Sequence, residues 1–351
     1  MRLIRKLSLG IGLFLVICGV LYFRSHRGKA PLETGYAANR QVIVWSTTAQ
    51  VREQVATVNF GDRLQILSRF GDEVQVRTES GVTGWVSQGD LLSSDFWKKT
   101  QDLEAEASKL PIEARGHTRV ISNMRMDPSR DSPRIRQLNK DVPVDMIERR
   151  VAAVSSPPNS AVPADVPPAQ TAPSPVDQTA ASAPIGGKKE DWWLVRAHLS
   201  DKTTASGWVL GRFVDLDVPD SLRDYASAAA MRIVAWFELS RIATPDGASR
   251  PQYLVVGTHG PEGQPCDFML LRVYTWSIPR GQYETAYIES NVCGTLPVKV
   301  SPVGTSGTDL TFEFSDTSAG VRQERVYRMQ HTIVKLVRQS GSTAKTRKHT
   351  H

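Results

Sequence analysis

The feature that most constrains the fold is a short block that the chain contains twice. "VTGWVSQGDL" at 82–91 is repeated as "TASGWVLGRF" at 204–213, so that Gly84-Trp85-Val86 matches Gly207-Trp208-Val209 123 positions later. Upstream, "VNFGDRLQIL" at 58–67 aligns with "LNKDVPVDMI" at 138–147 with an offset of 80. Ordered blocks that recur in the same sequence predict one domain that is written twice.

The change in offset locates an insertion in the second copy. Val76-Arg77 matches Val195-Arg196 at an offset of 119, which is 39 more than the upstream offset of 80. Residues 152–187 are almost all Ala, Pro, Ser, Val and Thr and contain no aromatic residue. Such a segment cannot bury enough apolar surface to order itself, so we expect a disordered loop within the second repeat. An idle spacer is the first interpretation, and docking of its Pro-rich part onto a repeat is the alternative.

Each copy has the pattern of β structure, and a helix is expected between them. "RLQILSRF" and "DEVQVRTES" alternate apolar and polar residues, as half-buried strands do. "SSDFWKKTQDLEAEASKL" is rich in helix formers and ends before Pro111. The expected order is a first repeat at 41–94, a connecting helix region at 95–116 and a second repeat at 117–218.

The repeated blocks resemble the bacterial SH3-like (SH3b) family, whose members are small β-barrels of the cell envelope. The second repeat matches the family pattern with "NMRMDPSRDSPRIRQL", "WWLVR" and "ASGWVLGRF". The first repeat is a degenerate match, because Glu73 or Val74 stands where the family has an aromatic residue. The resemblance implies two SH3-like β-barrels that bind ligands without catalysis. It also implies peptidoglycan or peptides of envelope proteins as partners.

Four tryptophans are the candidates for lining a ligand groove. Adjacent strand residues point to opposite faces, so one of Trp192 and Trp193 is expected to face outward beside the inserted loop. Trp85 and Trp208 each follow a glycine, which permits a bent strand start. For these two, packing in the core is the first interpretation and a groove the second.

A third region, 219–340, reads as a separate β domain. Short apolar segments separated by Gly- or Pro-bearing turns predict six or more antiparallel strands, and "RVYRMQHTIVKLV" at 325–337 is one of the expected strands. One face of one strand is expected to carry Leu310, Phe312 and Phe314. In "YETAYIES" we expect Glu284, Tyr287 and Glu289 on the solvent face, opposite Tyr283 and Ile288. A binding strand formed by the three polar residues is the alternative.

The same region holds the two cysteines outside the N-terminus. Cys266 and Cys293 are 27 positions apart, and in an exported domain this pair predicts a disulfide. Two separately buried thiols are the alternative.

Candidate chemistry is sparse. "GQPCDF" around Cys266 is not a helix-borne nucleophile of the cysteine-peptidase kind, and "HGPE" at 259–262 has no third metal ligand nearby. We therefore expect no catalytic residue, no metal site and no cofactor. The alternative is a wall-modifying enzyme with an active site of unrecognised form in the third region.

The N-terminus predicts export and membrane attachment. "MRLIRK" precedes 17 uncharged residues at 7–23, which as a helix would rise about 25 Å. An uncleaved signal anchor at 1–23 with a tether at 24–40 is the expectation; cleavage and lipidation at Cys18 are the alternatives, and basic residues on both flanks leave the orientation open.

The net positive charge of the chain does not change this interpretation. The net charge is +7, but apart from the N-terminal flank and the tail at 341–351 the basic residues are scattered. Nucleic acid is therefore not an expected partner. The sequence favours a mainly β, membrane-anchored, extracytoplasmic binding or scaffold protein with two SH3-like β-barrels and a C-terminal antiparallel β domain.

Overall fold

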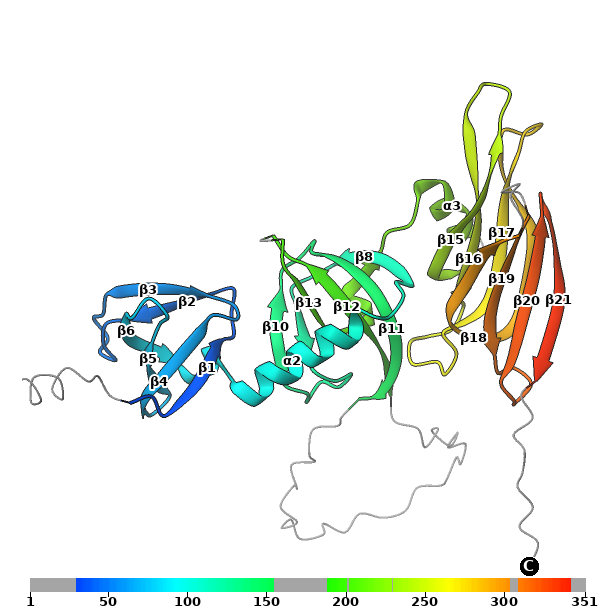
Figure 1. Ribbon diagram of the computed structural model, residues 1–351. Coiled ribbons are helices and arrows are strands. Elements are labelled where there is room, and N and C mark those ends of the chain that lie inside the picture. Colours follow the sequence, from blue (N-terminus) through cyan, green and yellow to red (C-terminus); the bar gives the residue numbers. More distant parts are fainter. Residues whose placement is uncertain (1–29, 155–187, 201, 229, 304–308, 342–351) are drawn as a thin grey trace, which may run out of the picture. The chain divides into compact units, whose positions relative to one another are not determined.

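The computed structural model describes residues 30–154, 188–200, 202–228, 230–303 and 309–341, and these are mainly β structure in three antiparallel sheets (Figure 1). The chain divides into two compact units, Met1–Gln101 with the first sheet and Asp102–His351 with the other two. Within the described ranges, no helix is both long and apolar enough to cross a membrane. The predicted anchor at 1–23 and nearly all of the predicted insertion lie outside those ranges.

The first sheet has seven strands in the order β3-β2-β6-β5-β4-β1-β7. The strands are β1 (Glu33–Ala37), β2 (Gln41–Trp45), β3 (Gln54–Asn59), β4 (Arg63–Phe70), β5 (Glu73–Arg77), β6 (Thr83–Ser87) and β7 (Leu91–Ser93), with a short 3-10 helix η1 (Gln88–Asp90) before β7. Because side chains alternate along each strand, every second one points into a common apolar core, which includes Val44, Leu64, Val76 and Val86.

The second sheet repeats this architecture. Its strands are β8 (Ala114–Thr118), β9 (Ser122–Arg125), β10 (Arg134–Leu138), β11 (Pro143–Ala153), β12 (Lys189–His198), β13 (Thr204–Leu210) and β14 (Val214–Leu216), with η2 (Gly211–Phe213) before β14. The strand order, β10-β9-β13-β12-β11-β8-β14, is that of the first sheet with each strand replaced by its counterpart seven places later.

The two sheets also share their register. Val76 pairs with Gly84 in the first sheet, and Val195 pairs with Gly207 in the second. A bulge follows Ile66 in β4, and a bulge follows Met146 at the equivalent place in β11. The residues aligned at offsets of 80, 119 and 123 thus occupy equivalent ladder positions, which is the structure that a duplicated domain requires.

The strands do not begin where the sequence patterns place the domain edges. Residues 33–37, which were expected in the tether, form β1 between β4 and β7. Likewise β8 begins at Ala114, before the expected start of the second repeat. Ala152 and Ala153, expected in the insertion, pair with Glu190 and Lys189 as the last residues of β11. In each case cross-strand pairing extends the sheet through residues whose local composition resembles a loop.

The helix α2 (Ser94–Ala107) follows the first sheet. Ser93 Oγ accepts a hydrogen bond from the Phe96 amide at 3.2 Å and so caps the first turn. In the first unit, the Trp97 ring stacks on Tyr36 with a centroid distance of 4.9 Å. In the second unit, Ala107 packs in a buried cluster of the second sheet, where its carbonyl accepts a hydrogen bond from Arg196 at 2.8 Å.

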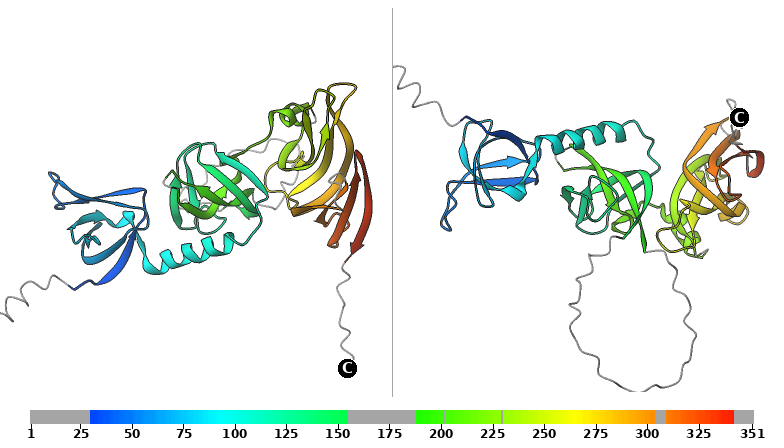
Figure 2. Two further views of the ribbon diagram at one scale, coloured as in Figure 1. Left: turned by 45° about the horizontal axis from the view of Figure 1, so that its top comes forward. Right: turned by 90° about the horizontal axis from the view of Figure 1, so that it is seen from below.

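The third sheet is a seven-stranded meander in sequence order. Its strands are β15 (Arg232–Ala243), β16 (Ser249–Thr258), β17 (Phe268–Ser277), β18 (Gln282–Pro302), β19 (Asp309–Asp316), β20 (Gln323–Gln330) and β21 (Ile333–Gly341). Figure 2 shows it from two further sides as one curved layer. The helix α3 (Asp220–Ala228) buries Leu222 against the aromatic side of this sheet.

Two sequence expectations for the third region can be compared directly with the sheet. Leu310, Phe312 and Phe314 are all buried, so the predicted apolar face of β19 is confirmed. "RVYRMQHTIVKLV", expected as one strand, is two strands, because His331 takes a positive φ of 56° and turns the chain back on itself.

Candidate functional sites

The outer face of the first sheet carries a pair of tryptophans. Trp45 in β2 lies directly opposite Trp85 in β6, and both are half-buried. The guanidinium carbon of Arg52 lies 4.5 Å from the Trp45 ring centroid, and Arg52 Nη1 is 3.3 Å from Glu73 Oε1. Phe70 pairs with Glu73 in the ladder and is 69% exposed. We call these five residues the first-repeat aromatic surface.

The equivalent face of the second sheet is buried. Trp208, the counterpart of Trp85, is 3% exposed, and Trp192, the counterpart of Glu73, is 3% exposed. Both belong to an apolar cluster that includes Leu194 and is completed by Leu103 and Ala107 of α2. Trp192 and Trp208 are therefore core residues, and the groove predicted for them is not formed, because α2 covers the face that an isolated repeat would expose.

Trp193 is on the opposite face of β12 and is also buried, with 6% exposure. The expectation that one of the two adjacent tryptophans faces solvent is thus wrong for both. Trp193 nevertheless lines a cavity of about 290 Å³, together with Arg232 and Ile233 of β15. Alternation along the strand holds, but the face that the sequence suggested would be free borders a cavity that residues of β15 also line.

One arginine at this cavity is almost completely enclosed. The Arg149 side chain is 5% exposed and donates to Asp191 Oδ1 at 2.6 Å and to Asp267 Oδ1 at 2.9 Å. It donates further to the carbonyls of Gln264 at 2.9 Å and Cys266 at 3.2 Å. Charges so deeply buried persist only when they are paired and hydrogen-bonded, so this arginine fastens the 264–267 loop to β11 and β12.

Two carboxylates near this arginine are strongly influenced by burial. Burial raises the pKa of Asp267 despite the hydrogen bonds that it accepts from the Leu296 amide and from Arg149. Burial, reinforced by the charge of Asp267, raises the pKa of Glu113 to about 7.

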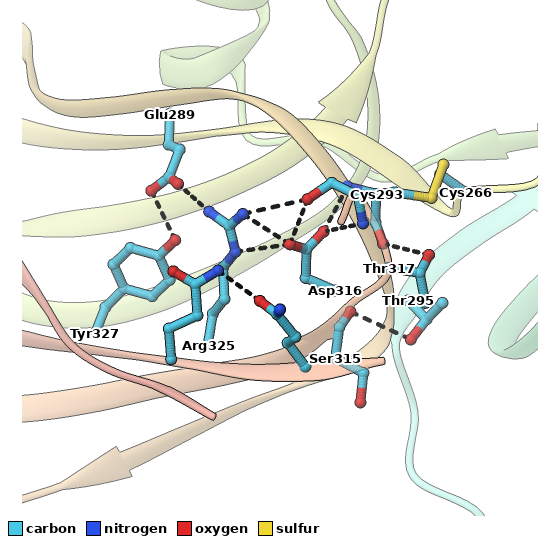
Figure 3. A network of polar contacts seen from close by, with 12 residues as sticks. Cys266, Glu289, Cys293, Thr295, Ser315, Asp316, Thr317, Arg325 and Tyr327 are labelled. Carbon is cyan, nitrogen blue, oxygen red and sulfur yellow. Dashed lines mark hydrogen bonds and ion pairs between the residues drawn. A yellow bond between two sulfur atoms is a disulfide. The ribbon is translucent and has the colours of Figure 1, made fainter. Parts of the chain in front are cut away.

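The same loop is held by the disulfide, as Figure 3 shows. Cys266, just before β17, is bonded to Cys293 in β18. The Cys293 amide donates to Asp316 Oδ1 at 2.7 Å, and Arg325 Nη2 lies 2.7 Å from Asp316 Oδ2. Arg325 also contacts Glu289, which accepts a hydrogen bond from the Tyr327 hydroxyl at 2.6 Å.

This network corrects the expected exposure along β18. Ile288, predicted to be inside, is 51% exposed, whereas Glu289 lies in the network above. The register shifts between Val273, opposite Tyr287, and Tyr274, opposite Thr285. This bulge adds one residue, so Tyr283 and Ile288 lie on one face, and Glu284, Tyr287 and Glu289 lie on the other. The residues therefore share faces as expected, but exposure differs from the expectation at Ile288 and Glu289. Burial and the hydrogen bond to Glu289 raise the pKa of Tyr287 to about 12.

The remaining Glu of that segment is at the surface end of the strand. Glu284 forms an ion pair with Arg280 at 2.7 Å, across the turn that joins β17 to β18. Glu284 is thus held by the turn, whereas Tyr287 and Glu289 are hydrogen-bonded to each other beside Arg325.

The residues that suggested chemistry are occupied structurally. Cys266 is in the disulfide and has no thiol to act as a nucleophile. His259 contacts the Ala230 carbonyl through Nδ1 at 2.8 Å, and His331 is in the β20–β21 turn. Across the residues that the structure describes, no group of three or more His, Cys, Asp or Glu side chains is placed to hold a metal ion.

Sequence reasoning missed Trp45, Arg149 and Asp191. Trp45 could have been found from the repeat. The offset of 80 aligns Trp45 with Arg125, and each of these residues lies opposite the tryptophan of its own Gly-Trp block, Trp85 or Trp208. Arg149 and Asp191 give no local signal, because they pair with each other 42 residues apart and their other partners, at 263–267, are more than 70 residues away.

Comparison with known proteins gives no family. No family model matches the chain, and no curated protein matches it in sequence. Solved structures that match include an NlpC/P60 family protein from Bacillus cereus ATCC 10987, with 10% identity and a TM-score of 0.22 over 60% of this chain and 65% of that one. NlpC2 and NlpC1 from Trichomonas vaginalis each match over 90% of this chain with 11% identity and a TM-score of 0.17, covering 100% and 95% of their own lengths. These TM-scores do not establish a shared fold.

Proposed function

We propose that the protein is a non-catalytic, membrane-anchored binding protein of the cell envelope, with extracytoplasmic SH3-like repeats. In this proposal the first repeat makes the contact with peptidoglycan or with a peptide of an envelope protein. The second repeat is a structural base, because its equivalent face is already occupied by α2.

The observation that carries the proposal is the different exposure of two equivalent tryptophans. Trp85 remains half-buried in the same position where Trp208 is 3% exposed. The tryptophan at this position is buried in the second copy but accessible in the first. The accessible ring therefore remains available to contact a partner.

The chemistry of the first-repeat aromatic surface is suited to a peptide or glycopeptide. Trp45, Trp85 and the 69% exposed Phe70 offer ring surface, while Arg52 and Glu73 offer one charge of each sign at its edge. Arg52 spans the two parts of the surface, since it contacts both the Trp45 ring and Glu73. Rings flanked by a few charged groups are the composition that dominates binding energy at recognition surfaces.

The test is a pull-down of the full-length protein on purified peptidoglycan and, in parallel, on immobilised envelope-protein peptides. Retention of the wild type, with at least about tenfold weaker retention of a Trp45→Ala/Trp85→Ala variant, is the expected result. Ile121→Ser is the matched control, because Ile121 is an exposed apolar residue (62%) on the second repeat. Release of soluble wall fragments would instead favour the wall-modifying enzyme, and equal retention of both variants would refute the proposed surface.

A further inference from the structure

The cavity beside Trp193 contains a buried carboxylate oxygen that has no hydrogen-bond donor. The Asp191 side chain is 3% exposed, and its Oδ1 accepts from Arg149 at 2.6 Å and from the Gly263 amide at 2.9 Å. Its Oδ2 is buried and accepts no hydrogen bond from any described residue. Arg232 Nη1 lies 3.8 Å from this oxygen, which is beyond hydrogen-bond distance. A buried acceptor of this kind is costly to leave unpaired, so the cavity presents a place for a donor.

The arginines at the same cavity have capacity for an acceptor. Arg232 is 50% exposed, and its guanidinium group forms a long ion pair with Asp191, with an N···O distance of 3.8 Å. Arg119 is 59% exposed and lies 3.8 Å from Asp215, which is also at the cavity. Guanidinium groups in such loose pairs keep N–H donors available, and they match the geometry of a carboxylate.

The remaining wall is partly charged and partly apolar, and its charged part is the ion pair of Arg212 and Glu262 at 3.5 Å. Met146, Trp193, Ile233 and Val234 line the cavity, whose volume of about 290 Å³ is at the lower end of the range for small-molecule sites. A ligand of a few non-hydrogen atoms with an apolar group therefore fits better than a nucleotide or an oligosaccharide.

We propose that this cavity binds a small zwitterion, an α-amino acid or the terminal residue of a short peptide with an apolar side chain. Its ammonium group donates to Asp191 Oδ2, and its carboxylate accepts from Arg232. The spacing agrees with this, because the ammonium nitrogen and carboxylate oxygens of one amino acid are about 3 Å apart, and the two protein atoms that receive them are 3.8 Å apart. The site is separate from the first-repeat aromatic surface.

Calorimetric titration of the full-length protein with free leucine tests the site. Leucine is expected to bind, and both N-acetylleucine, which lacks the ammonium group, and leucinamide, which lacks the carboxylate, are expected to bind at least about tenfold more weakly. Failure of folded protein to bind leucine, or equal binding of either analogue, would overturn the proposal and leave a cavity filled by water alone.

Variants separate this site from the proposed function and from general damage. Arg232→Gln is expected to weaken leucine binding about tenfold. Arg223→Gln, a change of an exposed arginine (66%) on α3 that does not line the cavity, is expected to leave it unchanged. Trp45→Ala/Trp85→Ala is also expected to leave leucine binding unchanged, so failure on peptidoglycan and failure on leucine are distinguishable. Unaltered binding by Arg232→Gln would contradict the assignment.

Discussion

Trp85 and Trp208 occupy the same ladder position in two copies of one sheet, yet only Trp208 is enclosed. Trp85 lies opposite Gln75, whereas Trp208 lies opposite Leu194, which is packed beneath α2. Duplication thus produced two identical frameworks, and the neighbours of each tryptophan determine whether it stabilises the fold or remains accessible to a ligand.

This relationship predicts unequal losses of stability. Trp208→Ala removes a fully buried indole, so the free energy of unfolding is expected to fall by about 3–5 kcal/mol. Trp85→Ala removes a half-buried one, and the expected loss is about 1 kcal/mol. Urea unfolding followed by circular dichroism measures both values. Equal losses would show that exposure does not distinguish the two copies.

The glycine before each tryptophan is required by close packing. A Cβ atom on Gly84 would lie 2.6 Å from the Trp45 carbonyl oxygen, a backbone atom that cannot move aside. Gly84→Ala is therefore expected to cost about 2 kcal/mol, measured by thermal unfolding. Gly89→Ala is the control, since its nearest neighbour would be Ser87 Oγ at 3.8 Å, and a change within about 0.5 kcal/mol is expected. A comparable loss for the two variants would contradict the steric explanation.

Stability is expected to depend on pH through Glu113. Its pKa is raised from 4.5 to about 7, mainly by burial, so between these values the folded protein retains a proton that the unfolded chain loses. The free energy of unfolding should consequently fall as pH rises from about 4.5 to about 7, by about 3 kcal/mol in total. Glu113→Gln stays neutral and should remove this part of the dependence. Urea unfolding across this pH range is the measurement, and parallel profiles for wild type and variant would refute it.

The buried ion cluster predicts a contrast between adjacent arginines. Arg149→Met leaves Asp191 and Asp267 without their buried partner, and the expected cost is about 3–5 kcal/mol. Arg150 is 55% exposed and pairs with Glu148. Arg150→Met should therefore lower the free energy of unfolding by less than about 1 kcal/mol. Chemical denaturation of both variants tests this, and similar costs would mean that Arg149 is not the fastening group.

The disulfide is expected to stabilise the third sheet. Cys266→Ala/Cys293→Ala opens a loop of 27 residues and should lower the free energy of unfolding by about 3 kcal/mol. Mass analysis of unreduced, alkylated protein checks the bond itself. Two alkylated thiols at these positions would contradict it, whereas labelling only after reduction would support it.

The sequence by itself was sufficient for the duplication, the place of the insertion and the β character of the third region. These depend on period-two alternation and on repeated blocks, which are local properties of the chain. Alternation placed Leu310, Phe312 and Phe314 correctly because β19 pairs without interruption. In β18 the bulge opposite β17 places Ile288 on the face of Tyr283, yet Ile288 is 51% exposed, because alternation assigns a face and not what covers it.

Only the tertiary structure decided which faces stay open. Trp192 and Trp208 are enclosed by α2, and Trp193 borders a cavity that residues of β15 also line. Both neighbouring segments are far away in sequence. Arg149 likewise finds acceptors more than 100 residues further along the chain. Strand patterns specify which side chains share a face, but what packs against that face depends on long-range contacts, which carry no local periodicity.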